Sequence, residues 1–100
     1  MKIDKTCEQE KLTVKVTGRL DTATAPELEE ALTEDITGAK SLTIDFADLE
    51  YISSAGLRVL LWAHKTMNQQ DGVMVVRGAN EEVQEVFTVT GFAEILIMED

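Results

Sequence analysis

The sequence contains one cysteine, one proline and one histidine in 100 residues. Cys7 alone cannot form an internal disulfide, and one Cys with one distant His cannot supply the roughly three or four ligands of a zinc site. No apolar run approaches the ~20 residues that span a bilayer, and residues 1–11 lack the apolar segment of a signal peptide. We therefore expect a cytoplasmic protein without a disulfide, a bound metal or a membrane-inserted segment.

The chain is also short of positive charge, since 9 Lys and Arg stand against 19 Asp and Glu, for a formal net charge of −10. Nucleic acid and anionic lipid are bound through neutralised phosphates, so a field of this sign repels both. The acidic surface favours a basic protein partner or serves only to keep the domain dissolved. With 44% hydrophobic residues, we expect residues 1–100 to form one globular domain with a modest core.

The first half of the chain predicts a hairpin followed by a helix. Residues 12–17, LTVKVT, alternate strictly between apolar and polar, so we expect strands at 2–8 and 11–18 joined by a short polar turn. The period then changes to that of a helix, with Thr24 as its cap and Glu27 as the matching capping-box residue. Gly38 is its expected end. Its predicted inward residues are Leu28, Ala31, Leu32 and Ile36.

The middle of the chain predicts a second strand-helix pair. Residues 41–46, SLTIDF, are rich in strand formers. The acidic residues after this strand, Asp48 and Glu50, together with Asp45, lack the spacing and glycine of a calcium loop, so we expect a solvated connection. A helical period begins at Ser54. Its predicted inward stripe is Leu57, Leu60, Leu61, His64 and Met67.

The last third completes an alternating pattern. Residues 73–78 predict a buried strand, Asn80 and Gly91 are the expected cap and end of a third helix with Val83, Val86 and Phe87 inward, and residues 93–99 predict a closing strand. The order is ββαβαβαβ. Strand-helix-strand repeats require parallel neighbours, and the opening hairpin adds an antiparallel edge. The fold class is α/β, a small mixed sheet with helices packed on it.

The start of the second helix carries the candidate chemistry, in the residues Ser53-Ser54-Ala55-Gly56. A nucleophile elbow needs Gly two places before the serine, where this chain has Ile52, and the only histidine lies on the inward stripe. No glycine-rich phosphate loop is present either. We expect no catalytic residues and no cofactor. The serines are then a helix cap, a phosphate acceptor or both, because a helix N-terminus favours negative charge.

Two segments resemble a known family. GRLDTATAPELEEAL and LTIDFADLEYISSAGLRVLL look like the STAS domain of bacterial anti-sigma factor antagonists, and the likeness continues through VQEVFTVTGFAEILIM near the end of the chain. The resemblance implies a binding module that docks on an anti-sigma factor, often a serine kinase, while its own serine is unmodified. Phosphorylation by the kinase releases the partner, and a separate serine phosphatase resets the switch.

The resemblance also assigns residues. The family's phosphorylated serine stands two places before the Gly-Leu pair, which is Ser54 here, and Asp21 matches an acidic residue near it that contributes to partner recognition. Ser53 stands where the family usually has Asp, so it is the second candidate acceptor. The residues implied in partner binding are Asp21, Thr22, Ser53, Ser54, Ala55, Gly56, Arg58 and Trp62.

Two further alternatives stay open. On a helical projection Trp62 points away from the inward stripe, beside Arg58 and Lys65. It is either an interface anchor or a side chain lying flat on its own surface. STAS domains also include adaptor subunits that are not phosphorylated, for instance of lipid-transport complexes, and ligand-sensing modules. The missing Asp at position 53 and the prominent Trp62 favour this second function.

Overall fold

The predicted hairpin opens the structure. In the computed structural model, which describes residues 1–99, β1 (Lys2–Glu8) pairs antiparallel with β2 (Lys11–Leu20). The two turn residues, Gln9 and Glu10, both have positive φ, as a tight hairpin turn requires. β2 runs two residues further than predicted.

The first helix, α1 (Ala25–Asp35), lies where its period predicted it, and Leu28 and Leu32 are fully buried. The predicted capping box is wrong. Thr24 is the N-cap residue, but its hydroxyl makes no bond to the helix. It donates to the carbonyl oxygen of Arg19 at 2.8 Å and accepts from the backbone N–H of Asp21 at 2.9 Å. The Thr24 hydroxyl is bonded to the preceding turn and is therefore not available to cap α1.

The middle of the chain contains a strand that the sequence did not predict. β3 (Ser41–Asp45) is followed by β4 (Leu49–Ile52) and α2 (Ser54–Gln69). The solvated connection expected around Glu50 is therefore a strand, paired parallel with the end of β2. Only the first and last residues of β4 are buried. Because a four-residue strand with this burial pattern does not alternate, it has no period for sequence analysis to detect.

The C-terminal third follows the prediction at its start and departs from it at its end. β5 (Val73–Arg77) and α3 (Glu81–Thr90) are confirmed, and Asn80 caps α3 by accepting from the N–H of Val83 at 2.8 Å. β5 is only half buried, with Val73 50% exposed. The strand predicted over 93–99 is largely wrong: α4 (Phe92–Ile95) takes its first part and β6 (Ile97–Glu99) the rest. The left-handed Gly91, at φ 84°, redirects the chain into this short helical turn.

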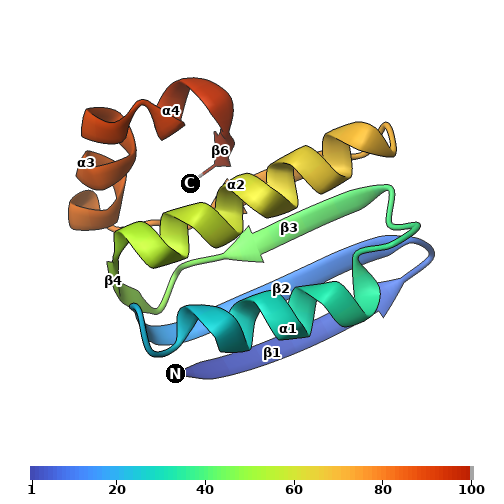
Figure 1. The fold of residues 1–100 in the computed structure, drawn as a ribbon, viewed down its shortest axis with the longest axis horizontal. Helices are drawn as coiled ribbons and strands as arrows, with labels where there is room; N and C mark the ends of the chain where they lie inside the picture. Colours follow the sequence, from blue (N-terminus) through green and yellow to red (C-terminus); the bar gives the residue numbers. More distant parts are fainter. Residues whose placement is uncertain (100) are drawn as a thin grey trace.

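The sheet has the predicted mixed topology. Its order is β1-β2-β3-β5-β6, with β4 beside β2, and all pairings except β1–β2 are parallel. The element order is ββαββαβααβ instead of ββαβαβαβ, because β4 and α4 are added. Figure 1 shows α1 and α2 side by side in front of the strands, with α3 and α4 grouped beside the C-terminal end of the chain. The fold class is confirmed.

One face of the sheet forms the core. Alternate residues of β2, β3 and β5 are buried against the helices, and their neighbours in sequence are half exposed. α2 contributes more than the predicted stripe, since Val59 and Ala63 are buried while Leu61 and His64 are only half buried. The largest fully buried side chains are Phe46, Phe87, Leu12, Leu20, Leu28, Leu32, Leu42, Ile44, Leu49, Leu60 and Met67.

β2 has two different partners on one side. Its first half, Lys11 to Lys15, pairs with β3, and its last residues, Gly18 to Leu20, pair with β4 after a register shift at Gly18/Arg19. Gly18 has φ 103° and donates to the carbonyl oxygen of Asp48 at 3.0 Å. This fork fixes the place where α2 begins, because only Ser53 separates the end of β4 from the start of α2.

Candidate docking and modification site

The start of α2 is capped by Ser53. Its backbone is extended (φ −102°, ψ 175°), and its hydroxyl oxygen faces the N–H of Gly56 at a long 3.4 Å. The backbone N–H of Ser53 donates to the carbonyl oxygen of Leu20 at 2.9 Å, and its carbonyl oxygen accepts from Leu57 at 3.0 Å. Ser53 is thus tied to the end of β2 and to the first turn of the helix, and it performs the capping role that sequence analysis left open.

Ser54 is the first residue of α2 and is exposed. Among residues 1–99 its hydroxyl takes part in no side-chain hydrogen bond, because its neighbour already supplies the cap. A hydroxyl at a helix N-terminus is also in a favourable place for negative charge. The structure therefore separates the two serines: one is committed to the fold and the other faces solvent.

Asp21 organises the turn between β2 and α1. One carboxylate oxygen accepts from the backbone N–H groups of Ala23 and Thr24, each at 3.0 Å. These bonds favour the ionised form, and the pKa of Asp21 lies below its ordinary value chiefly because of the Thr24 backbone N–H. Burial opposes this effect, while the Thr24 hydroxyl, the Ala23 N–H and the charge of Arg19 add to it. The carboxylate is thus held charged and fixed in the turn.

Gly56 is the one member of the predicted docking set that the structure places inside the protein. A Cβ atom there would lie 2.7 Å from Cγ of Leu20 and 2.9 Å from Cγ1 of Ile52, both far inside van der Waals contact. The missing side chain lets α2 approach the ends of β2 and β4. Gly56 is therefore buried and contributes indirectly, because this close approach sets the position of the two serines.

A groove of ≈ 250 Å³ runs between the first turns of α1 and α2. It brings together three of the predicted docking residues, Thr22, Ala55 and Arg58, with Glu29 on the opposite wall. The complete lining is Thr22, Ala25, Pro26, Glu29, Ala55, Arg58 and Val59. The groove therefore joins the turn after β2, at Thr22, to the start of α2, at Ala55 and Arg58.

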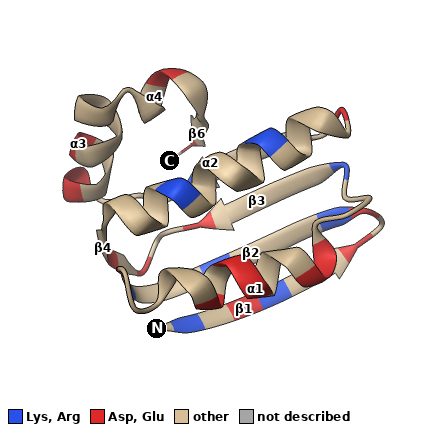
Figure 2. Ribbon diagram, viewed as in Figure 1, with Lys and Arg blue, Asp and Glu red and all other residues tan. Residues whose placement is uncertain are grey.

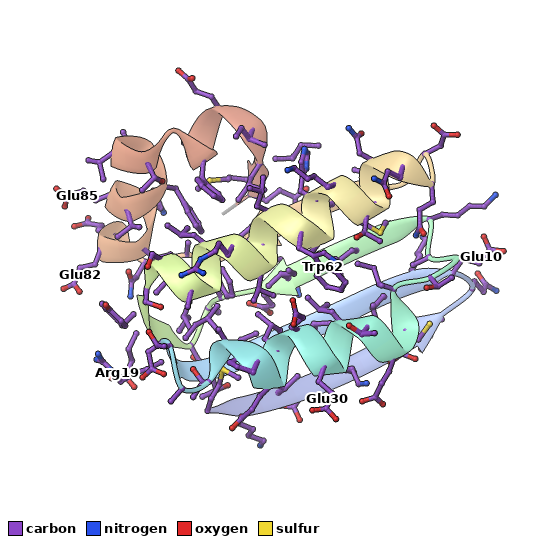
Figure 3. All side chains as sticks on the ribbon, in the orientation of Figure 1. Glu10, Arg19, Glu30, Trp62, Glu82 and Glu85 are labelled. Atoms are coloured by element: carbon purple, nitrogen blue, oxygen red, sulfur yellow. The ribbon has the colours of Figure 1, made fainter. Side chains whose placement is uncertain are left out.

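Trp62 is half buried and packs against the core residues, which the helical projection did not predict. Figure 3 shows its side chain between α2 and α1. The projection treated α2 as a helix packed only on the sheet, whereas α2 also contacts α1, and Val59 lines the groove between the two helices. Part of the Trp62 side chain is buried by this packing. Only its exposed part is available for docking.

Sequence analysis missed a second feature at the same end of the molecule. Arg19 stacks its guanidinium on the ring of Tyr51 at 4.3 Å, across the β2–β4 pair. Arg19 also lines an open hollow of ≈ 760 Å³ whose other wall includes Glu81 and Glu82 of α3. Tyr51, an aromatic residue three places before the first residue of α2, was the available signal, but without β4 it had no partner strand.

The single histidine of the chain lies far from Ser54. His64 lies ten residues along α2 from Ser54, about 15 Å at the rise of an α-helix, so it cannot act on that hydroxyl. Within residues 1–99, no group of three or more His, Cys, Asp and Glu side chains is arranged to hold a metal ion. In the same range no helix is both long and apolar enough to cross a bilayer.

Comparison with known proteins decides the family. The family model described as "STAS domain" matches residues 2–100. The chain belongs to the STAS family. The anti-sigma-B factor antagonist of Staphylococcus aureus (strain NCTC 8325 / PS 47) is 30% identical over 99 residues, which cover 96% of this chain and 90% of that protein. The resemblance seen in the sequence is confirmed.

Solved structures confirm the fold of this STAS domain. An anti-sigma factor antagonist from Mycobacterium paratuberculosis has a TM-score of 0.87 at 22% identity, covering 98% of this chain and 84% of that one. The Bacillus protein SpoIIAA in its phosphorylated form has a TM-score of 0.77 at 16% identity, covering 97% of this chain and 90% of that one. At such identities the likeness concerns the fold.

Proposed function

We propose that this chain is a single STAS domain that acts in the cytoplasm as an anti-sigma factor antagonist, a binding module and not an enzyme. It binds an anti-sigma factor while Ser54 is unmodified and releases it when Ser54 is phosphorylated, which regulates transcription. The observation that carries the proposal is the exposed Ser54 hydroxyl, left without a structural bond because Ser53 caps the helix. Curated relatives with the antagonist name support it.

The docking surface that we propose surrounds this hydroxyl. Asp21 presents a fixed charge from the turn after β2, and the groove between α1 and α2 continues the surface toward Arg58. Its members are Asp21, Thr22, Ser53, Ser54, Ala55, Arg58 and the exposed part of Trp62, with Gly56 supporting them from inside. The net charge of −10 suits a partner with a basic face.

Phosphorylation acts on this surface by charge. The partner, as a serine kinase, would transfer the γ-phosphoryl group of ATP to Oγ of Ser54: an O–P bond forms, the bond to ADP breaks, and the hydroxyl proton passes to a base of the kinase. The product carries nearly two negative charges in the middle of the docking surface. Burying these charges in the contact requires their desolvation, which opposes association, and a serine phosphatase removes the group.

Two substitutions at position 54 test the switch. Ser54→Ala adds no charge at position 54 and should bind the anti-sigma factor constitutively, whereas Ser54→Asp should bind at least about tenfold more weakly, because a carboxylate in the middle of the contact must be desolvated. Affinity is measured by titration calorimetry with the purified partner. Thr88→Ala is the control, since it removes an exposed hydroxyl on α3, outside the proposed docking surface, and should leave the affinity unchanged.

The outcomes separate this proposal from its alternatives. Equal affinities of S54A and S54D would contradict the switch and favour a STAS adaptor or ligand-sensing subunit that is not phosphorylated. Mass spectrometry after incubation with the kinase and ATP locates the phosphate. Modification of Ser53 instead of Ser54 would move the acceptor to the capping residue.

A further inference from the structure

α2 differs from the other long helices in charge. It contains Arg58 and Lys65 and no acidic residue, although the chain as a whole carries 19 Asp and Glu. Figure 2 shows two blue segments on α2, while α1 and α3 carry red ones. Within residues 1–99 neither Arg58 nor Lys65 forms an ion pair with a side chain. The helix that begins at Ser54 thus holds two uncommitted cations.

Arg58 lies one helical turn after Ser54, and both residues are exposed. Residues four apart on a helix share a face, with Cβ atoms about 5–6 Å from each other. Side chains lean toward the N-terminus of their helix, so an arginine at position 58 has the length and direction to reach back over the turn that holds Ser54. An anion at i with a cation at i+4 is the more favourable order of such a pair. Lys65, eleven residues from Ser54, is too far along the helix for this contact.

We propose that Arg58 is the internal counter-ion of phosphorylated Ser54, its guanidinium donating hydrogen bonds to the phosphate oxygens. This inference rests on the proposed modification of Ser54. Arginine suits the role because its planar fork donates two parallel bonds to an oxyanion. In the unmodified protein Arg58 lines the groove opposite Glu29, open to a partner. Phosphorylation then changes the docking surface twice, by adding negative charge at Ser54 and by withdrawing a positive group from the groove.

A four-protein cycle tests the pair. The full chain is made with serine or with genetically encoded phosphoserine at position 54, each with and without Arg58→Ala, so that no kinase is needed. In each background we compare the melting temperature with phosphoserine to that with serine at position 54. We expect this difference to be about 2–5 °C more positive with Arg58 than with the R58A variant. The second pKa of the phosphate, followed by ³¹P NMR, should be lower by about half a unit with Arg58 than with Ala.

Lys65→Ala is the matched control, because it removes an exposed cation from the same helix. It should leave both measurements unchanged, and Arg58→Lys should retain part of each effect. If R58A and K65A behave alike, the proposed pair is wrong. This result is independent of the switch: a missing Arg58 effect leaves the comparison of S54A with S54D standing. Conversely, failure of that comparison leaves the phosphate–guanidinium measurement intact.

Discussion

The neighbouring serines Ser53 and Ser54 have different environments, because the first is the N-cap residue of α2 and the second is the first residue of the helix. Ser53 bonds to β2 and caps α2, while Ser54 faces solvent. The sequence predicted that one of them would cap, but a helix boundary cannot be placed to a single residue from periodicity. Position 53 follows β4 directly, and β4 was not predicted. The division of roles between the two serines therefore depended on a strand that only the structure shows.

At the same scale, Asp21 makes stability depend on pH. Its folded pKa is lowered, mainly by the Thr24 backbone N–H, so it stabilises the fold above the unfolded pKa of about 3.9. That stability is lost as pH falls through the folded pKa. Asp21→Asn keeps an acceptor oxygen but removes the charge. We expect it to be less stable than the wild type at neutral pH, with the difference vanishing in acid.

Thermal unfolding between about pH 2 and pH 7 measures this effect. Glu30→Gln, which removes an exposed carboxylate from the surface of α1, is the control and should show no comparable convergence. A wild-type-to-D21N difference that stays constant over the whole range would contradict the assignment.

At the scale of elements, the agreement between prediction and structure follows the strength of the periodic signal. β2 alternates over its buried positions, and α2 keeps a helical period over sixteen residues, so both were predicted. β4 and α4 have four residues each, too few for either period to establish itself. Trp62 was misplaced for a related reason, because a helical projection does not reveal that α1 packs beside α2.

The contact of α2 with the ends of β2 and β4 depends on Gly56. Helix propensity alone predicts that Gly56→Ala stabilises α2 by about 1 kcal/mol. The structure predicts the opposite, because the added methyl group would overlap the side chains of Leu20 and Ile52. We expect a net loss of roughly 1–3 kcal/mol, typical of an overpacked core. Chemical denaturation measures it, with Ser54→Ala on the exposed side of the same turn expected within about 0.5 kcal/mol of wild type. A stabilised G56A would contradict the close contact.

For the whole molecule, composition gave the sign of the charge but not its distribution. Six ion pairs occur among residues 1–99, all with at least one partner substantially exposed, and such pairs contribute little. Repulsion within a chain of charge −10 should then outweigh them. The topology was predictable because alternating strands and helices admit few arrangements.

This balance predicts how salt acts on the folded state. Raising NaCl from about 0.01 M to about 1 M shortens the screening length from roughly 30 Å to roughly 3 Å. The melting temperature should rise, because long-range repulsion is screened more than the short contacts are lost. A double Glu29→Gln, Glu30→Gln variant, with two fewer negative charges, should show a smaller rise. A melting temperature that falls with salt would mean that the ion pairs dominate.

The fork in β2 has a consequence for divergence among related modules. The half of β2 that pairs with β3 belongs to the continuous sheet, whereas the half that pairs with β4 carries Arg19 and leads into Asp21. We expect substitutions in this second half to alter the proposed docking surface without disturbing the strand register of the first half. Related modules are therefore expected to differ in partner choice chiefly at this end of the domain, while the continuous sheet stays the same.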